Sequence, residues 1–131
     1  MLIGEFQMTS RYVEVDRSAF ISALEEKGFT RDSLAKGEVV YTRQHHADPT
    51  MQVKIFTSLP NRSGDARACG QDAIRVLLIF TNPKSGKSGC LFKAARVYRT
   101  GTQEKVIERT IERAREAYAE ATRRFKLFRA A

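Results

Sequence analysis

Residues that can bind a polyanion are concentrated in the middle of this sequence, where cations are interspersed with aromatic side chains. Between Gly37 and Gly101 there are ten basic residues and only four acidic ones. Guanidinium and ammonium groups bind phosphates, and aromatic rings stack on unpaired bases. A duplex keeps its base faces covered by their neighbours. The pattern therefore predicts a surface for single-stranded nucleic acid.

The candidate nucleic-acid-binding residues are the cations and aromatics of this region that we expect to face away from the helices or to lie in its loops. They are Arg43, Lys54, Phe56, Arg67, Arg75, Lys84, Lys87, Lys93, Arg96, Tyr98 and Arg99. We expect Tyr41, His45 and Phe92 on the same outward surface. The alternative for Phe56, Phe92 and Tyr98 is packing in a subunit interface or under a loop.

The stretch Asn82–Ser88 ends in Gly-Lys-Ser, the ending of a phosphate-binding P-loop. The first glycine of that motif would fall at Thr81, and the residues after Ser88 read as a strand instead of a helix. We therefore expect a flexible basic turn here, able to contact a nucleic-acid backbone through Lys84 and Lys87, and no nucleotide-hydrolysing site.

Four residues have the chemistry of zinc ligands, but no two have the spacing that zinc sites use. They are His45, His46, Cys69 and Cys90. We expect no metal, no cofactor and no enzymatic activity.

The enzymatic alternative is a small metal-dependent nuclease. Gln52-Val53-Lys54 is similar to the strand end of a restriction-type nuclease core, with Asp48 as the upstream acid, or with Asp65 and Asp72 as metal ligands.

Length, charge and cysteine content narrow the class of protein. The chain has 131 residues, 42% hydrophobic content and a formal net charge of +8, which favour a single basic domain over residues 1–131. Two cysteines are too few for a secreted disulfide scaffold, and no apolar run is long enough to span a membrane. We expect a cytoplasmic protein, with residues 1–10 a disordered or vector-derived lead.

The expected elements are a helix at 16–28, a sheet within 39–99 and a long helix at 102–126. Asp16 is a candidate N-cap and Gly28 a stop for the first helix. We expect a turn at 29–37 with one further helical turn at most. The strands are expected at 39–46, 51–59, 72–81 and 90–99.

The long helix has one apolar stripe and a mostly compensated charged surface. The stripe is predicted to contain Ile107, Ile111, Ala114, Tyr118, Ala121, Phe125 and Phe128. Glutamates recur every four residues from Glu104 to Glu120 beside basic residues, which is typical of a solvated face. The stripe favours packing on a sheet over a free coiled coil. The cations after Glu120 are expected to lack acidic partners.

These elements predict an α+β fold: one two-layer domain, with a four-stranded antiparallel sheet and both helices on one of its faces. Over residues 38–125 this arrangement is similar to the single-strand-binding folds of the transcriptional-coactivator and Whirly type, and more loosely to the core of strand-annealing proteins. The similarity is one of fold and rests on no motif.

The functional expectation is a non-enzymatic protein that binds or anneals single-stranded DNA in replication, recombination or repair and forms a homo-oligomer. Double-stranded DNA and RNA stay open as ligands. The alternative from another class is a protein-interaction module or inhibitor that docks through the open face of its sheet. The expectation includes no membrane partner.

Overall fold

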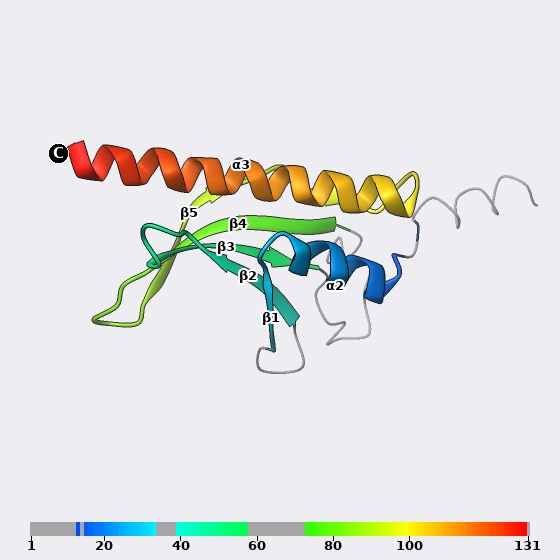
Figure 1. The fold of residues 1–131 in the computed structure, drawn as a ribbon, viewed down its shortest axis with the longest axis horizontal. Coiled ribbons are helices and arrows are strands. Elements are labelled where there is room, and N and C mark those ends of the chain that lie inside the picture. Colours follow the sequence, from blue (N-terminus) through cyan, green and yellow to red (C-terminus); the bar gives the residue numbers. More distant parts are fainter. Residues whose placement is uncertain (1–12, 14, 34–38, 58–72, 131) are drawn as a thin grey trace, which may run out of the picture.

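The computed structural model describes residue 13 and residues 15–33, 39–57 and 73–130. They form an α+β fold in which two helices lie on one side of an antiparallel sheet (Figure 1). In chain order the elements are α2 (Arg17–Glu26), β1 (Thr30–Ser33), β2 (Val39–Gln44), β3 (Met51–Phe56), β4 (Ala73–Thr81), β5 (Ser88–Lys93), β6 (Val97–Tyr98) and α3 (Gln103–Ala130). The expected lead at 1–10 lies outside the described residues.

The sheet is an antiparallel meander in the order β1-β2-β3-β4-β5, and β6 pairs with the other half of β4. The expectation of four strands is therefore corrected in two places. Thr30–Ser33, expected to be a turn or a helical turn, is the edge strand β1. Its sequence contains Asp and Ser, which disfavour strands, so pairing with β2 overrides local propensity.

The expected last strand at 90–99 is two strands, β5 and β6. A bulge in the β4–β5 pairing between Leu78 and Ile79 places Leu78 opposite Phe92 and Ile79 opposite Cys90. A bulge bends its strand and increases the local twist. Strand β5 ends at Lys93, after which Ala94 N–H still donates to the Val76 carbonyl of β4 at 3.0 Å. Strand β6 then pairs with β4 at Val97 and Tyr98.

Helix α2 begins and ends where the sequence predicts. The side chain of Asp16 accepts a hydrogen bond from the backbone N–H of Ala19 at 2.9 Å, as an N-cap does. Gly28 has a φ of 89°, which favours glycine, and Phe29 N–H then bonds back to Leu24 at 3.0 Å. The buried Phe20 and Leu24 join the core between α2 and the sheet.

The core lies between the helices and the alternate residues of β3 and β4. Val53 pairs with Leu78 and Ile55 with Val76, and all four side chains are buried. Helix α3 crosses this face along its length (Figure 1). The side chains between these residues on β3 and β4 point to the opposite face of the sheet.

The contact stripe of α3 differs from the predicted one by a rotation of the helix. The buried residues are Val106, Thr110, Ala114, Ala117 and Ala121. Larger residues of the predicted stripe, such as Ile107 and Ile111, are half-buried on its flanks, and Phe128 is 61% exposed. Small side chains allow the helix axis to approach the sheet closely, so they occupy the line of contact. The buried Thr110 hydroxyl donates to the Val106 carbonyl at 2.8 Å.

Among the described residues, neither helix has a stretch long and apolar enough to cross a membrane.

The packing of α3 can be tested by placing a charge in the line of contact. We expect Ala117→Asp to lower the free energy of unfolding by about 3 kcal/mol or more, because a buried carboxylate there has no partner. Ala119→Asp, two residues away on the exposed side of the same helix, is the control and should be nearly neutral. Urea denaturation measures both, and equal stabilities would contradict this packing.

Candidate nucleic-acid interface

The helix-free face is the sheet surface turned away from α2 and α3. The residues that pairing register places on it include Thr42, Lys54, Phe56, Arg75, Leu77, Ile79 and Lys93. Val40, opposite Phe56, and Gln52, opposite Ile79, lie on the same face and are buried. Lys54 and Lys93 are both opposite Leu77 and so lie in one row across three strands. Phe56 is opposite Arg75 in the next row. Four of the predicted binding residues are thus neighbours on one surface.

Phe56 and Arg75 form a cation–π pair at the centre of this group. The guanidinium carbon of Arg75 lies 5.0 Å from the centroid of the Phe56 ring, and both side chains are half-buried. Such a contact contributes about 0.5–1 kcal/mol at an exposed site. It holds a flat cation and an aromatic ring together, and both are surfaces on which bases stack.

The charge of the helix-free face has one sign over its central strands. The Lys54 ammonium is 3.3 Å from the Thr42 hydroxyl, and Lys93 is exposed. Among the described residues of β2 to β5 that point to this face, none is acidic. One acidic residue, Asp32, lies on the neighbouring edge strand β1, where it pairs with Val40 of β2. Tyr98 of β6, opposite Ala73 and 49% exposed, extends the face at its end.

The expectation that Tyr41, Arg43 and His45 face away from the helices is wrong. Tyr41 pairs with Ile55 and Arg43 with Val53, so both point towards the helices, and His45 is buried on the same side. Tyr41 packs edge-on against Phe20 with 5.8 Å between ring centroids. These residues combine an apolar body with a polar tip and can therefore line a core boundary.

Arg43 is held on the helix side by two contacts. Its guanidinium carbon lies 4.2 Å from the centroid of the Tyr118 ring on α3. A side chain at position 28 would place its Cβ atom 3.4 Å from the Arg43 Nε atom. Because Gly28 has no side chain, it leaves the space that the arginine occupies. The two contacts give Arg43 a packing role at the edge of the core.

Three other predicted site residues, Arg99, Arg96 and Arg67, are not among the residues that pairing places on the helix-free face. Arg99 donates from Nη2 to the Thr57 carbonyl at 2.7 Å and lies by the helix side of the sheet. Arg96 is exposed between β5 and β6, and Arg67 lies outside the described residues. Phe92, which we expected to face outward, packs against the core because it is opposite Leu78, which points to the helix side.

The turn that contains Lys84 and Lys87 is ordered by its own hydrogen bonds. The Asn82 side chain accepts from the backbone N–H groups of Lys84 and Ser85 at 2.8 and 3.3 Å. Asn82 N–H donates to the Lys87 carbonyl at 2.8 Å, and Gly86 takes a φ of 74°. The two lysine side chains are exposed. The turn therefore presents its cations at the far end of the β4–β5 hairpin.

His45 is the centre of a polar network that sequence analysis missed. It is 2% exposed, and its ring lies 4.9 Å from that of Tyr118. Ala47 N–H donates to Nδ1 at 3.2 Å, so Nε2 carries the proton and donates to the Thr122 hydroxyl at 2.9 Å. Burial, followed by the nearby His46, lowers the pKa of His45. The network joins the end of β2 to α3 and requires a neutral imidazole.

The residues considered for a metal site have other partners. Asp48 accepts from the N–H and hydroxyl of Thr50, at 3.1 and 2.5 Å, and so stabilises the β2–β3 turn. His46 shares a 2.9 Å hydrogen bond with the Tyr118 hydroxyl. Cys90 is an exposed free thiol. Within the described part of the chain, no three histidine, cysteine or acidic side chains are placed to hold a metal ion. Cys69, Asp65 and Asp72 lie outside it.

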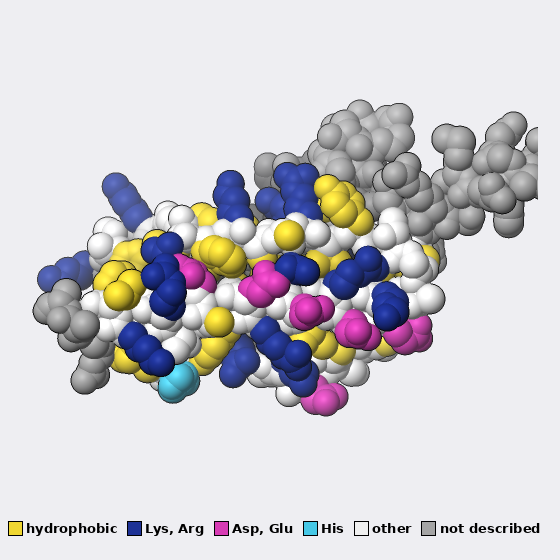
Figure 2. Space-filling model, turned by 90° about the horizontal axis from the view of Figure 1, so that it is seen from above, with side chains coloured by type: hydrophobic (Ala, Val, Ile, Leu, Met, Phe, Trp, Pro, Cys, Tyr) yellow, Lys and Arg dark blue, Asp and Glu magenta, His cyan; other side chains and the backbone are white. Residues whose placement is uncertain are grey.

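The outer surface of α3 carries both signs of charge, as Figure 2 shows. Arg113 pairs with Glu116, while Arg123 and Arg124 both bind Glu120, at 2.5 and 2.7 Å. The expectation that the cations after Glu120 lack acidic partners is therefore wrong for these two arginines. Hydrogen bonds from Arg123, and then from Arg124, lower the pKa of Glu120 to about 2. This compensation makes the outer surface of α3 a weaker candidate for a polyanion.

No protein-family model, curated protein or solved structure matches this chain.

The network around His45 predicts a loss of stability in acid. An exposed histidine in the unfolded chain has a pKa near 6.5, and the pKa of His45 in the folded protein is lower. At pH values between these two pKa values the unfolded chain therefore binds more protons than the folded protein. The stabilisation is fully present above about pH 6.5 and is lost as the pH falls towards the folded pKa, with a slope of up to about 1.4 kcal/mol per pH unit.

Urea denaturation of the parent protein and of His45→Gln at pH 7.5, 6.5 and 5.5 measures this contribution. Glutamine keeps hydrogen-bonding groups at the site but does not titrate. We expect a smaller loss of stability in the variant than in the parent between pH 7.5 and 5.5. Equal losses in both proteins would show that His45 does not control the acid response.

Proposed function

We propose that this protein binds nucleic acid through the helix-free face, with single-stranded DNA as the preferred form. The observation that carries the proposal is the Phe56–Arg75 pair beside Lys54 and Lys93, on adjacent paired strands. Cations attract phosphates and release their counterions, and the ring and guanidinium provide stacking surfaces. The formal net charge of +8 supports the same class of ligand.

The dimensions of the sheet suit an extended strand. Neighbouring strands are spaced about 4.8 Å apart, so the cations of β3, β4 and β5 extend over roughly 10 Å across the sheet. A strand crossing it can place phosphates near Lys54 and Lys93 while a base stacks on Phe56 or on the Arg75 guanidinium. A duplex covers its base faces and offers this pair only its backbone. The preference for single strands follows from the use of stacking.

Apolar residues between the cations favour one alternative function. Leu77 and Ile79 lie on the helix-free face and are half-buried. They would also suit a protein partner, so an interaction module or inhibitor is the second candidate. Salt distinguishes the two, because phosphate binding weakens steeply as salt rises, whereas an apolar protein interface does not.

The proposal also covers pathway, assembly and location: the protein acts in replication, recombination or repair, as a homo-oligomer in the cytoplasm. The C-terminal end of α3 projects past the sheet (Figure 1). It exposes Leu127 and Phe128, at 55% and 61%. A second copy of the chain is the partner that we assign to this end, which leaves the helix-free face available for nucleic acid.

Three single substitutions test the proposed interface. We expect Phe56→Ala to cost roughly 1–3 kcal/mol of single-strand affinity through lost stacking. Lys54→Ala and Arg75→Ala should weaken binding to every sequence and each lower the slope of log affinity against log salt by about 0.7. Fluorescence anisotropy of labelled oligo(dT) at several salt concentrations measures both effects.

Lys105→Ala, which removes an exposed cation from α3, is the matched control and should bind as the parent does. The proposal is contradicted if all three sheet variants fold and bind oligo(dT) like the control. If they instead lose the oligomer and keep binding, the helix-free face is a subunit contact.

A further inference from the structure

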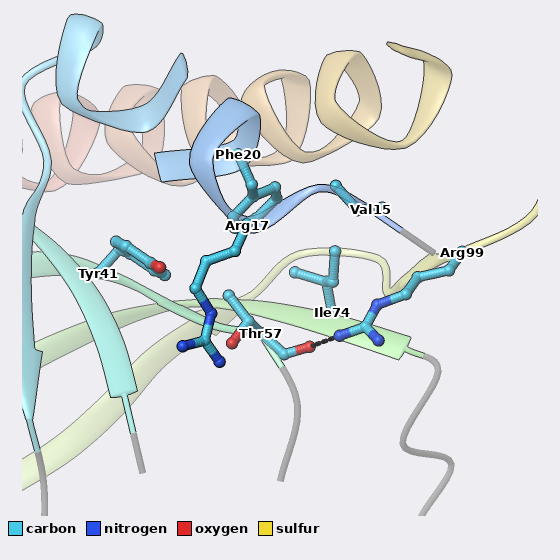
Figure 3. A pocket seen from close by; sticks show the side chains of 7 residues that line it. All are labelled: Val15, Arg17, Phe20, Tyr41, Thr57, Ile74 and Arg99. Atoms are coloured by element: carbon cyan, nitrogen blue, oxygen red, sulfur yellow. Dashed lines mark hydrogen bonds between the residues drawn. The ribbon is translucent and has the colours of Figure 1, made fainter. Parts of the chain in front are cut away.

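A pocket on the helix side of the sheet carries a second arrangement of cations and hydroxyl groups. It has a volume of about 200 Å³ and lies between the start of α2, the ends of β3 and β4, and the segment after β6 (Figure 3). Its lining consists of Val15, Arg17, Phe20, Tyr41, Thr57, Ile74 and Arg99. Because Tyr41 and Ile74 point towards the helices, the pocket is separated from the helix-free face by the sheet itself.

The Tyr41 hydroxyl points into this pocket (Figure 3). Tyr41 is only 4% exposed, and no described residue forms a hydrogen bond with its hydroxyl. Buried tyrosine hydroxyls normally have a partner. Burial raises the pKa of Tyr41, so the phenol keeps its proton and can donate it in a hydrogen bond.

Two arginines line the same pocket as the hydroxyl. Arg99 uses one nitrogen to bind the Thr57 carbonyl at 2.7 Å, which fixes the side chain at the rim and leaves its other N–H donors unused by described residues. Arg17 extends from the first turn of α2 between Tyr41 and Thr57 (Figure 3), and no described residue pairs with it. The Thr57 side chain supplies a further hydroxyl at the end of β3.

The charges around the pocket favour an anion. The charged groups that act on Tyr41 are Arg31, Arg17 and Glu25, two cations and one acid. Arg99 adds a third cation at the rim, and Asp16 is engaged as the N-cap of α2. The lining itself contains two arginines and no acidic residue among those described.

We infer that this pocket, with Arg17, Arg99 and Tyr41 as donors, binds a phosphate monoester. Guanidinium groups match the oxygens of phosphate in geometry, and two of them balance its double negative charge. The phenol and the Thr57 hydroxyl can satisfy further oxygens. The cavity exceeds the roughly 150 Å³ that holds a benzene molecule, so the phosphate and part of its organic group fit. Phe20 and Ile74 provide an apolar wall for that group.

The monoester has two chemical sources, a free mononucleotide or the 5′-phosphate at the end of a nucleic-acid strand. Isothermal titration with thymidine 5′-monophosphate, and with thymidine as the neutral analogue, tests the site itself. Oligo(dT) with and without a 5′-phosphate then separates the sources. The proposal for the pocket and the proposal for the helix-free face can be contradicted separately, because binding of the unphosphorylated oligomer reports only on the helix-free face.

We expect the monophosphate to bind and thymidine to bind at least about tenfold more weakly, a difference of about 1.4 kcal/mol. Arg17→Gln and Tyr41→Phe should each weaken monophosphate binding several-fold. Tyr41→Phe keeps the ring that packs on Phe20, so it preserves the fold. Arg113→Gln, on α3 and outside the pocket, is the control and should bind as the parent does.

A terminal phosphate is the source if the 5′-phosphate tightens oligomer binding and Tyr41→Phe removes the gain. If the 5′-phosphate has no effect while the monophosphate still binds, the free monoester is the source. The inference is overturned if the monophosphate binds no better than thymidine, or if both pocket variants bind it like Arg113→Gln while melting at the parent temperature.

Discussion

The packing of α3 on the central strands determines which surfaces of this protein are available for binding. A line of small residues that includes Ala114, Ala117 and Ala121 lets the helix lie directly on the buried side chains of β3 and β4. Helix and sheet each have one apolar surface, and this contact buries both. Because α2 is placed on the same side, both helices cover one face of the sheet. The opposite face then carries the cations of the same strands, interspersed with apolar residues such as Leu77 and Ile79.

The two faces of the sheet carry different polar chemistry as a result. On the helix-free face the Phe56–Arg75 pair and the flanking lysines form a cationic surface over paired strands. On the helix side polar residues lie at the margins of the core, where burial changes their properties. His45 is kept neutral between β2 and α3, and Tyr41 keeps its proton at the pocket beneath α2. The first surface suits an extended polyanion and the pocket a single phosphate.

Much of the fold could be predicted from the sequence where polar and apolar residues alternate clearly. In β3 and β4, Lys54 and Arg75 interrupt apolar runs, so their direction could be assigned. In β2 the residues on both faces of the strand suit a sheet. Tyr41, Arg43 and the following His45 each combine an apolar part with a polar tip, so pattern alone gave the wrong face. Hydrophobicity also favoured Ile107 and Ile111 as the contact stripe, whereas close packing selects the alanines.

Other features depend on contacts that are distant in the sequence. Edge strand β1 has little strand propensity and is formed by pairing with β2. The His45 network requires Thr122, which is 77 residues away in the chain. The pocket beneath α2 requires Arg17 and Arg99 to converge from opposite ends of the described fold. None of these contacts leaves a local signal, so only the three-dimensional arrangement reveals them.

The most direct test of the central claim is to map where a single strand contacts the folded protein. Titration of isotopically labelled protein with oligo(dT), followed by ¹H–¹⁵N NMR spectroscopy, reports the affected backbone groups. We expect the largest shifts in β3, β4 and β5, at Lys54, Phe56, Arg75 and Lys93. Shifts confined to α3 would contradict binding on the helix-free face. The absence of any shift at low salt and at a large excess of oligo(dT) would also contradict it.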